Sequence, residues 1–266
     1  AMGHFRPVLA LHLGMGQGRP HALDDGEGAV MRVLVACEYS GRVRDAFIRA
    51  GHEAMSCDLL DTEAPGPHYV GDVRDVIGGG WDLMISHPPC TYLASSGLHW
   101  NKRVPGRAEK TQEALSFVRM LLDAPIPKIA LENPIGCIST NVRRPDQTVQ
   151  PWMFGEDASK ATCFWLKNLP PLVPTSRHEG QYGCKCGHRF PIALGKYRCP
   201  NCAGENGAAK VVYANQTNSG QNNLSPGADR WKERSRTFQG IADAMADQWG
   251  GVVSRAGQAD LFAEAA

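Results

Sequence analysis

The chain has 266 residues, which suits one sizeable domain or a domain with a small appendage. Its composition, 42% hydrophobic and 21% charged, is typical of a globular protein with a full core, and no apolar run approaches the ~20 residues of a membrane span. The nine cysteines are odd in number and scattered, so we expect no disulfide framework. They indicate a reducing compartment, and we expect a cytoplasmic monomer.

Charge is distributed unevenly along the chain. Residues 177–236 hold ten Lys and Arg against four Asp and Glu, a net +6, although the whole chain carries only +1. A basic segment on an acidic body is the pattern expected of a protein that contacts a polyanion. A solvated basic surface would have the same composition.

The first half of the chain predicts a parallel sheet. Residues 1–30 are rich in glycine and are expected to form a flexible leader. A strand over 31–37, a helix over 43–50 closed by Gly51 and a strand over 52–57 make a βαβ unit. We expect further strands at 69–72, 81–85, 128–131 and 162–166, an amphipathic helix over 107–122 and a closing helix over 236–249.

Two of these strands run into proline motifs that carry reactive side chains. Trp81 to Ile85 continues as Ser86-His87-Pro88-Pro89-Cys90, and the strand at 128–131 continues as Glu132-Asn133-Pro134. Proline ends a ladder, so each strand is expected to stop there, at the edge where open α/β sheets bind ligands. One thiol beside one carboxylate suits attack by sulfur assisted by an acid.

A second cluster is formed by cysteines. Cys184-Lys185-Cys186-Gly187-His188 precedes Cys199-Pro200-Asn201-Cys202, with twelve residues between the two pairs. Four thiolates suit a closed tetrahedral zinc site, which is structural rather than catalytic, and His188 is an alternative ligand for one of them. A ribbon of this size cannot build its own core, so we expect the metal to supply folding free energy.

Taken together, the motifs resemble those of the DNA cytosine-5 methyltransferases over residues 31–250. Pro88-Pro89-Cys90 matches the family's nucleophile motif, and Glu132-Asn133-Pro134 matches its Glu-Asn motif in order and spacing. The resemblance implies that Cys90 adds to C6 of cytosine, that Glu132 hydrogen-bonds N3 of the ring, and that Asn133 orients Glu132 or the base. It also implies a flipped cytosine as substrate, DNA as partner and a small phage or restriction-modification enzyme.

The resemblance further implies S-adenosylmethionine as cofactor. The loop after the first strand, Ala36 to Gly41, stands where the family has a Gly-rich loop but contains one glycine. Asp58 ends the second strand, where an acid accepts from ribose hydroxyls, and Asp72 would accept from the adenine amino group. Either aspartate would equally suit a loop cap. The residues assigned to the cofactor are Glu38, Tyr39, Ser40, Gly41, Asp58, Asp72 and Pro88.

DNA contacts are expected after the catalytic half. Lys160 is the nearest candidate for holding the flipped base. Alternating cations in an extended segment would point to one side, toward phosphates, and the amides of residues 215–223 would reach base edges. The alternating cations are Arg230, Lys232, Arg234 and Arg236.

The expected fold is therefore α/β, a Rossmann-like methyltransferase sheet with helices on both faces and a zinc-ribbon insertion. We expect a catalytic and cofactor-binding domain over 31–176, a target-recognition region over 177–235, a closing helix over 236–252 and a tail over 253–266. Three alternatives stay open: an RNA cytosine-5 methyltransferase, an N4 or N6 amino methyltransferase, and an inactive zinc-dependent nucleic-acid-binding module.

Overall fold

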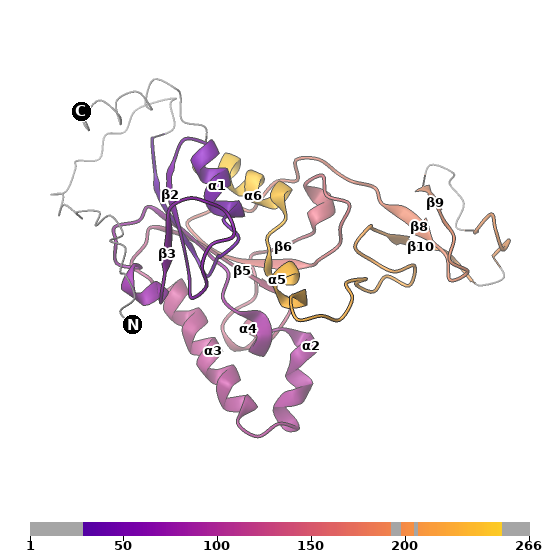
Figure 1. Ribbon diagram of the computed structural model, residues 1–266, viewed down its shortest axis with the longest axis horizontal. Helices are drawn as coiled ribbons and strands as arrows, with labels where there is room; N and C mark the ends of the chain where they lie inside the picture. The colour runs from indigo at the N-terminus through magenta and orange to yellow at the C-terminus, as the bar shows by residue number, and fades with distance from the viewer. Residues whose placement is uncertain (1–28, 193–197, 205–206, 252–266) are drawn as a thin grey trace, which may run out of the picture.

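The computed structural model describes residues 29–192, 198–204 and 207–251. The expected leader, except its last two residues, and the expected tail lie outside these residues. A large sheet with helices packed on it forms the body, and a small three-stranded sheet projects from the body (Figure 1). The α/β class predicted from the sequence is confirmed.

The large sheet has seven strands in the order β3-β2-β1-β4-β5-β7-β6. The first five run parallel, and β7 runs antiparallel to both β5 and β6. The order 3-2-1-4-5 is that of a doubly wound, Rossmann-like sheet. The strands are β1 Arg32–Ala36, β2 Glu53–Asp58, β3 His68–Val70, β4 Leu83–Ser86, β5 Lys128–Pro134, β6 Gln147–Val149 and β7 Thr162–Lys167.

Strand β5 is longer than its sequence predicts. The expected strand ended at Leu131, but the ladder continues through Glu132 and Asn133 to Pro134. Antiparallel pairing with β7 supplies the partners, and Asn133 lies opposite Cys163. The carboxylate is thus carried by a strand and not by a turn, which fixes its position more firmly.

Helices cover both faces of the sheet, as predicted. Their bounds are α1 Arg42–Arg49, α2 Ser95–Leu98, α3 Arg107–Leu122, α4 Ile138–Asn141, α5 Arg230–Ser235 and α6 Gln239–Met245. Helix α3 has the bounds that the apolar pattern predicts. The closing helix begins later than predicted, at Gln239, and continues as a π-helical turn, Ala246–Gly250.

The period-two alternation of the strands divides the core into two layers. Val33 and Val35 of β1 pack in the layer that contains α1 and α6, whereas Leu34 packs in the layer that contains α3. Leu83 and Met84 of β4 alternate in the same way. Successive side chains point to opposite faces of a strand, so both layers hold every central strand in register.

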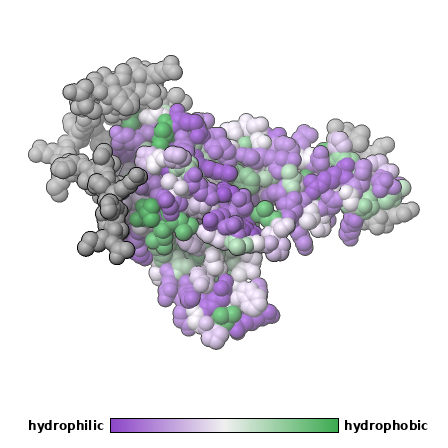
Figure 2. Space-filling model, in the orientation of Figure 1, coloured by the Kyte–Doolittle hydropathy of each residue, from purple (hydrophilic) through white to green (hydrophobic). Residues whose placement is uncertain are grey.

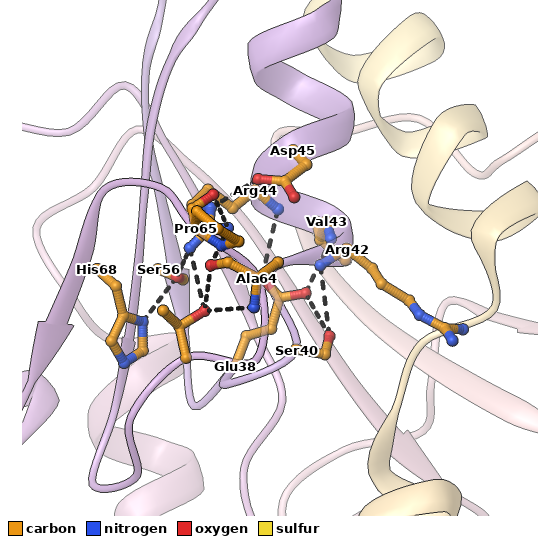
Figure 3. A network of polar contacts seen from close by, with 11 residues as sticks. Glu38, Ser40, Arg42, Val43, Arg44, Asp45, Ser56, Ala64, Pro65 and His68 are labelled. Carbon is orange, nitrogen blue, oxygen red and sulfur yellow. Dashed lines mark hydrogen bonds and ion pairs between the residues drawn. The ribbon is translucent and has the colours of Figure 1, made fainter.

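A buried arginine ties α1 to the loop after β2. Arg44 is fully buried, and its guanidinium ion-pairs with Asp45 at 2.8 Å and donates to the hydroxyl of Ser56 and to the carbonyl of Ala64 (Figure 3). Gly41 lies so close that a Cβ there would be 2.4 Å from the Arg44 guanidinium. Its positive φ of 73° also favours glycine.

The projecting unit is an antiparallel sheet in the order β10-β8-β9. Its strands are β8 Gln181–Gly183, β9 Arg189–Pro191 and β10 Lys210–Val212. Tyr182 and Phe190 pack with cysteines to form its small core. With so few apolar side chains, this unit depends on a further source of stability.

The face of the molecule seen in Figure 2 is largely hydrophilic, and hydrophobic residues form small, separate patches on it. Among the described residues, no helix combines the length and the apolar character needed to cross a membrane.

Replacing Arg44 should destabilise the body. In Arg44→Met, Ser56 and the loop carbonyls lose their donor inside the protein, so we expect the free energy of unfolding to fall by about 2–3 kcal/mol. Arg49→Met is the matched control, because its ion pair with Asp243 is exposed and contributes less than about 1 kcal/mol. Urea denaturation measures both. Equal losses of unfolding free energy in the two variants would show that the buried Arg44 network stabilises the protein no more than the exposed ion pair does.

Candidate functional site

The candidate site lies where the strand order of the sheet reverses. Strands β1 and β4 are parallel neighbours, and the chain leaves them in opposite directions, toward β2 and toward β5. Open α/β sheets bind ligands at the carboxyl ends of such strands. The loop 37–41 and the segment 87–92 both begin there, and the His87 amide donates to the Ala36 carbonyl at 2.9 Å.

In the loop after β1, a carboxylate caps helix α1. One oxygen of Glu38 accepts from the Val43 amide at 2.8 Å and from the Ser40 hydroxyl, and the other accepts from the Arg44 amide (Figure 3). Glu38 is buried, and Tyr39 beside it donates through its hydroxyl to the Lys232 carbonyl at 2.8 Å. The helix end is thus occupied by an internal anion, which disfavours a phosphate there.

The two proline motifs lie on neighbouring strands. Cys90 begins the 3-10 turn Cys90–Tyr92 after β4 and is exposed, whereas Glu132 on β5 is buried. His87 Nδ1 lies 2.8 Å from Glu132 Oε2, and both side chains are 8% exposed. The Asn133 amide donates to the Pro88 carbonyl at 2.7 Å, so it holds the turn that presents the thiol rather than bonding Glu132.

Burial raises the pKa values of Cys90 and Glu132, and nearby cations lower them. Burial by itself raises the pKa of Glu132, but Lys160 and the bond from His87 outweigh it, and the pKa lies below its usual range. Although Cys90 is exposed as a residue, neighbouring protein partly desolvates its thiol, and this raises the pKa of Cys90; Lys160 opposes that rise, Glu132 adds to it, and Arg234 again opposes it. Lys160 therefore favours the ionised form of both groups.

Asp58 and Asp72 each cap a loop. Asp58 accepts from the Leu60 amide at 3.0 Å, and burial raises its pKa. Asp72 accepts from the backbone amide of Arg74 and pairs with its guanidinium at 2.7 Å; the backbone bond lowers the pKa of Asp72. Both negative charges act on the Cys37 thiol, which places them around the same strand ends.

A small cavity of about 40 Å³ opens between the two loops and the segment before α6. It is lined by Cys37, Glu38, Tyr39, Ser40, His87, Ser235 and Thr237. Four of these residues belong to the loop after β1, where the sequence predicts a cofactor. The other walls come from the end of β4 and from residues far along the chain.

The four cysteines of the projecting unit come together. The sulfurs of Cys184, Cys186, Cys199 and Cys202 all lie within 4.8 Å of one another, and two of the pairs are 3.6 Å apart. Tetrahedral zinc with Zn–S bonds of about 2.3 Å separates its sulfurs by about 3.8 Å. The cluster therefore fits a metal such as zinc. His188 is not part of it; its ring stacks on Phe190.

The expected row of cations is wrong in its geometry. Residues 230–235 form helix α5, in which alternate residues do not share a face. Arg236 forms a two-pronged ion pair with Glu63, and Lys232 lies 3.5 Å from Asp229. Arg230 donates to the Leu224 carbonyl. Arg234 remains exposed, and its charge acts on Cys90.

Most of the amides expected to read bases are used internally. The side chain of Asn215 bonds both the amide and the carbonyl of Ser159. Asn218 connects the Cys184 carbonyl to Arg189. Asn215 thus ties the segment after β10 to the body, whereas Asn218 ties that segment to Cys184 after β8 and to Arg189 in β9.

Sequence reasoning missed two roles. His87 lies in the proline motif, directly after an expected strand. A histidine at such a strand end was the signal that the sequence offered for its role. Lys160 was expected to hold a base, but its ammonium donates to the Arg234 carbonyl at 3.0 Å and acts on both Cys90 and Glu132. Only the folded chain brings these residues together.

Removing the charge of Lys160 should slow alkylation of Cys90. Because Lys160 lowers the pKa of the thiol, Lys160→Met should raise that pKa and reduce the thiolate fraction at pH 8 severalfold. Iodoacetamide labelling followed by peptide mass spectrometry, over a range of pH, gives the rate at Cys90 alone. Lys210→Met, in the projecting sheet, should leave the profile unchanged. A profile for Lys160→Met that matches wild type would contradict this reading.

The purified chain should contain about one equivalent of zinc. Cys199→Ser should lose it, whereas Cys137→Ser, a cysteine outside the cluster, should retain it. Chelation should make residues 177–207 sensitive to protease while the circular dichroism of the large sheet persists, because the small unit has too small a core to stay folded without the metal. A metal-free chain with a protease-resistant ribbon would rule out the site.

No protein-family model matches this chain, and no curated protein matches it. The function must therefore be argued from the residues and the geometry described above.

Proposed function

We propose that the chain transfers a methyl group from S-adenosylmethionine to C5 of cytosine in DNA, with Cys90 as nucleophile and Glu132 as the group that contacts the base. The observation that carries the proposal is the pairing at the sheet edge. An exposed thiol follows β4, a buried carboxylate lies on the neighbouring β5, and one cation, Lys160, acts on both. This combination is what covalent attack on a ring carbon requires.

The carbon that receives the methyl group is a poor nucleophile, so the protein must activate it. The Cys90 thiolate adds to C6, and the electron pair of the 5,6 double bond becomes available at C5. S-adenosylmethionine, when bound, would supply the electrophilic methyl group to C5, and breaking its sulfur–methyl bond would leave neutral S-adenosylhomocysteine. After C5 is methylated, a base removes its proton, the double bond re-forms and Cys90 leaves as thiolate.

Glu132 has to offset the charge that develops on the ring. Hydrogen bonding to N3 requires a proton, and the ionised state favoured by Lys160 and His87 means that this proton must be acquired as the base enters. Lys160 then supplies the positive charge that acts on both Cys90 and Glu132. Asn133 keeps the turn with Cys90 in place through Pro88.

The residues around the cavity fit a cationic nucleoside that lacks phosphate. Glu38 already caps the amides of α1, so the usual phosphate position is taken, while Asp58 and Asp72 add negative charge nearby. The assigned residues Tyr39, Ser40 and Gly41 form the loop that would contact such a ligand. Because 40 Å³ is far below the ~300 Å³ of ordinary ligand pockets, we expect Ser235 and Thr237 to shift when it binds.

Three observations favour nucleic acid as the substrate carrier. The region 177–236 carries a net charge of +6, the projecting unit extends from the body (Figure 1), and the exposed Arg234 acts through its charge on Cys90. A cytosine can meet Cys90 only if it leaves its stack. RNA has the same base, and the choice between the two is an outcome of the test below.

Cys90→Ser should abolish methyl transfer and leave cofactor affinity near wild type, because the thiol contacts the base. DNA and RNA duplexes with and without 5-fluorocytosine, incubated with labelled cofactor, measure both transfer and a trapped adduct, since fluorine blocks the final elimination. Cys163→Ser is the matched control for loss of a thiol. Transfer to RNA alone, or to an exocyclic nitrogen, would replace this proposal with the corresponding alternative.

Asp58→Ala should weaken binding of S-adenosylmethionine by about 1–3 kcal/mol, the cost of an unmade bond to a buried partner. Asp61→Ala, an exposed carboxylate in the following loop, is the control for a change of net charge. Isothermal titration calorimetry gives both affinities. Unchanged binding in Asp58→Ala would move the cofactor elsewhere on the sheet.

A further inference from the structure

His87 contacts Glu132 and also belongs to the wall of the cavity. Its backbone amide bonds the Ala36 carbonyl at the end of β1, so its position is set by the sheet itself. One nitrogen of its ring reaches Glu132 on β5, and the residue lines the cavity beside Glu38 and Thr237. His87 thus lies between the carboxylate and the cavity.

The bond to Glu132 fixes which ring nitrogen carries hydrogen. The low pKa of Glu132 makes its carboxylate an acceptor, and at 2.8 Å the partner must donate. The hydrogen therefore lies on Nδ1. In the neutral ring, Nε2 is then an acceptor with a free lone pair.

That second nitrogen is buried without a hydrogen-bond partner among the described residues. A buried polar atom left unpaired is costly, and native proteins retain such atoms mainly where a ligand or water completes them. His87 also lines the cavity, together with four residues of the loop after β1. Because Nε2 has almost no accessible surface, a hydroxyl or ammonium hydrogen of a ligand would reach it as the cavity widens with the shift of Ser235 and Thr237.

We propose that His87 has two separable roles: Nδ1 positions Glu132 for the base, and Nε2 accepts a hydrogen bond from an N–H or O–H group of the bound cofactor. The inference rests on the function proposed above and adds a residue to it. It makes His87 a positioning residue toward the base and a direct contact toward the cofactor. Loading the cavity and orienting Glu132 are then linked through one rigid ring.

Two substitutions separate the roles, because each amide reaches one ring nitrogen. His87→Asn places an amide near the Nδ1 position and keeps a donor for Glu132, but has no atom at Nε2. His87→Gln places its amide near Nε2 and leaves Glu132 without its donor. Both are made in the full-length, zinc-loaded chain, and thermal unfolding checks that each variant folds.

Cofactor affinity and turnover should respond differently in the two variants. For His87→Asn we expect a cofactor Kd about tenfold higher, with turnover at saturating cofactor within a few-fold of wild type. For His87→Gln we expect a nearly unchanged Kd and turnover lower by about 100-fold. Loss of the same quantity in both variants, or of neither, would overturn the inference.

Nitrogen NMR of the wild-type protein reports the same ring without mutation. Nδ1 should appear protonated, and the signal of unprotonated Nε2 should move when S-adenosylmethionine is added. A wild-type chain that binds cofactor and methylates DNA, but shows no shift at Nε2, refutes the role of His87 and leaves the proposed function intact. A chain that transfers no methyl group refutes the proposed function, while a protonated Nδ1 would still support the positioning of Glu132.

Discussion

The site depends on the parallel pairing of β1 and β4 at the point where the strand order reverses. Because the chain departs from β1 toward α1 and from β4 toward α3, on opposite faces, the two loops do not compete for space at the shared edge. The bond between the His87 amide and the Ala36 carbonyl extends that pairing by one residue. It brings the loop with Glu38 and the turn with Cys90 to the same edge.

Negative charge at this edge of the sheet is balanced by Lys160, which is held in place by a segment far along the chain. The groups that become negative here are Glu132 on β5 and the Cys90 thiol after β4, and Lys160 favours the ionised form of both. Its ammonium is held by the Arg234 carbonyl, so the position of α5 determines how Lys160 acts on Cys90 and Glu132. The segment before the closing helix, nearly 150 residues after the thiol, thereby becomes part of the site.

The same segment also closes the cavity. The Tyr39 hydroxyl bonds the Lys232 carbonyl, Arg236 pairs with Glu63, and Arg42 donates to the Thr237 carbonyl at 3.0 Å. These bonds join α5 to the loops after β1 and β2. A cation used this way is not free for phosphate, which explains why counting Lys and Arg along the sequence overstated the basic surface.

Local pattern decided much of the fold in advance. Short apolar runs predicted β1 and β4, and the helical period at 107–122 predicted α3, because burial leaves a recognisable pattern in the sequence. Spacing alone also singled out the four cysteines, since a closed site needs ligands in pairs on short turns. The proline motifs indicated Cys90 and Glu132, because each motif follows an expected strand and carries a reactive side chain.

Tertiary structure decided the features that depend on contacts between residues far apart in the sequence. The extension of β5 pairs with β7, and residues 230–235 form a helix that Tyr39 bonds through the Lys232 carbonyl, a contact that the alternating charges do not predict. The pairing of His87 with Glu132, 45 residues apart, exists only because β4 and β5 are adjacent. Long-range hydrogen bonds and charge effects depend on distance in space, and a sequence records only distance along the chain.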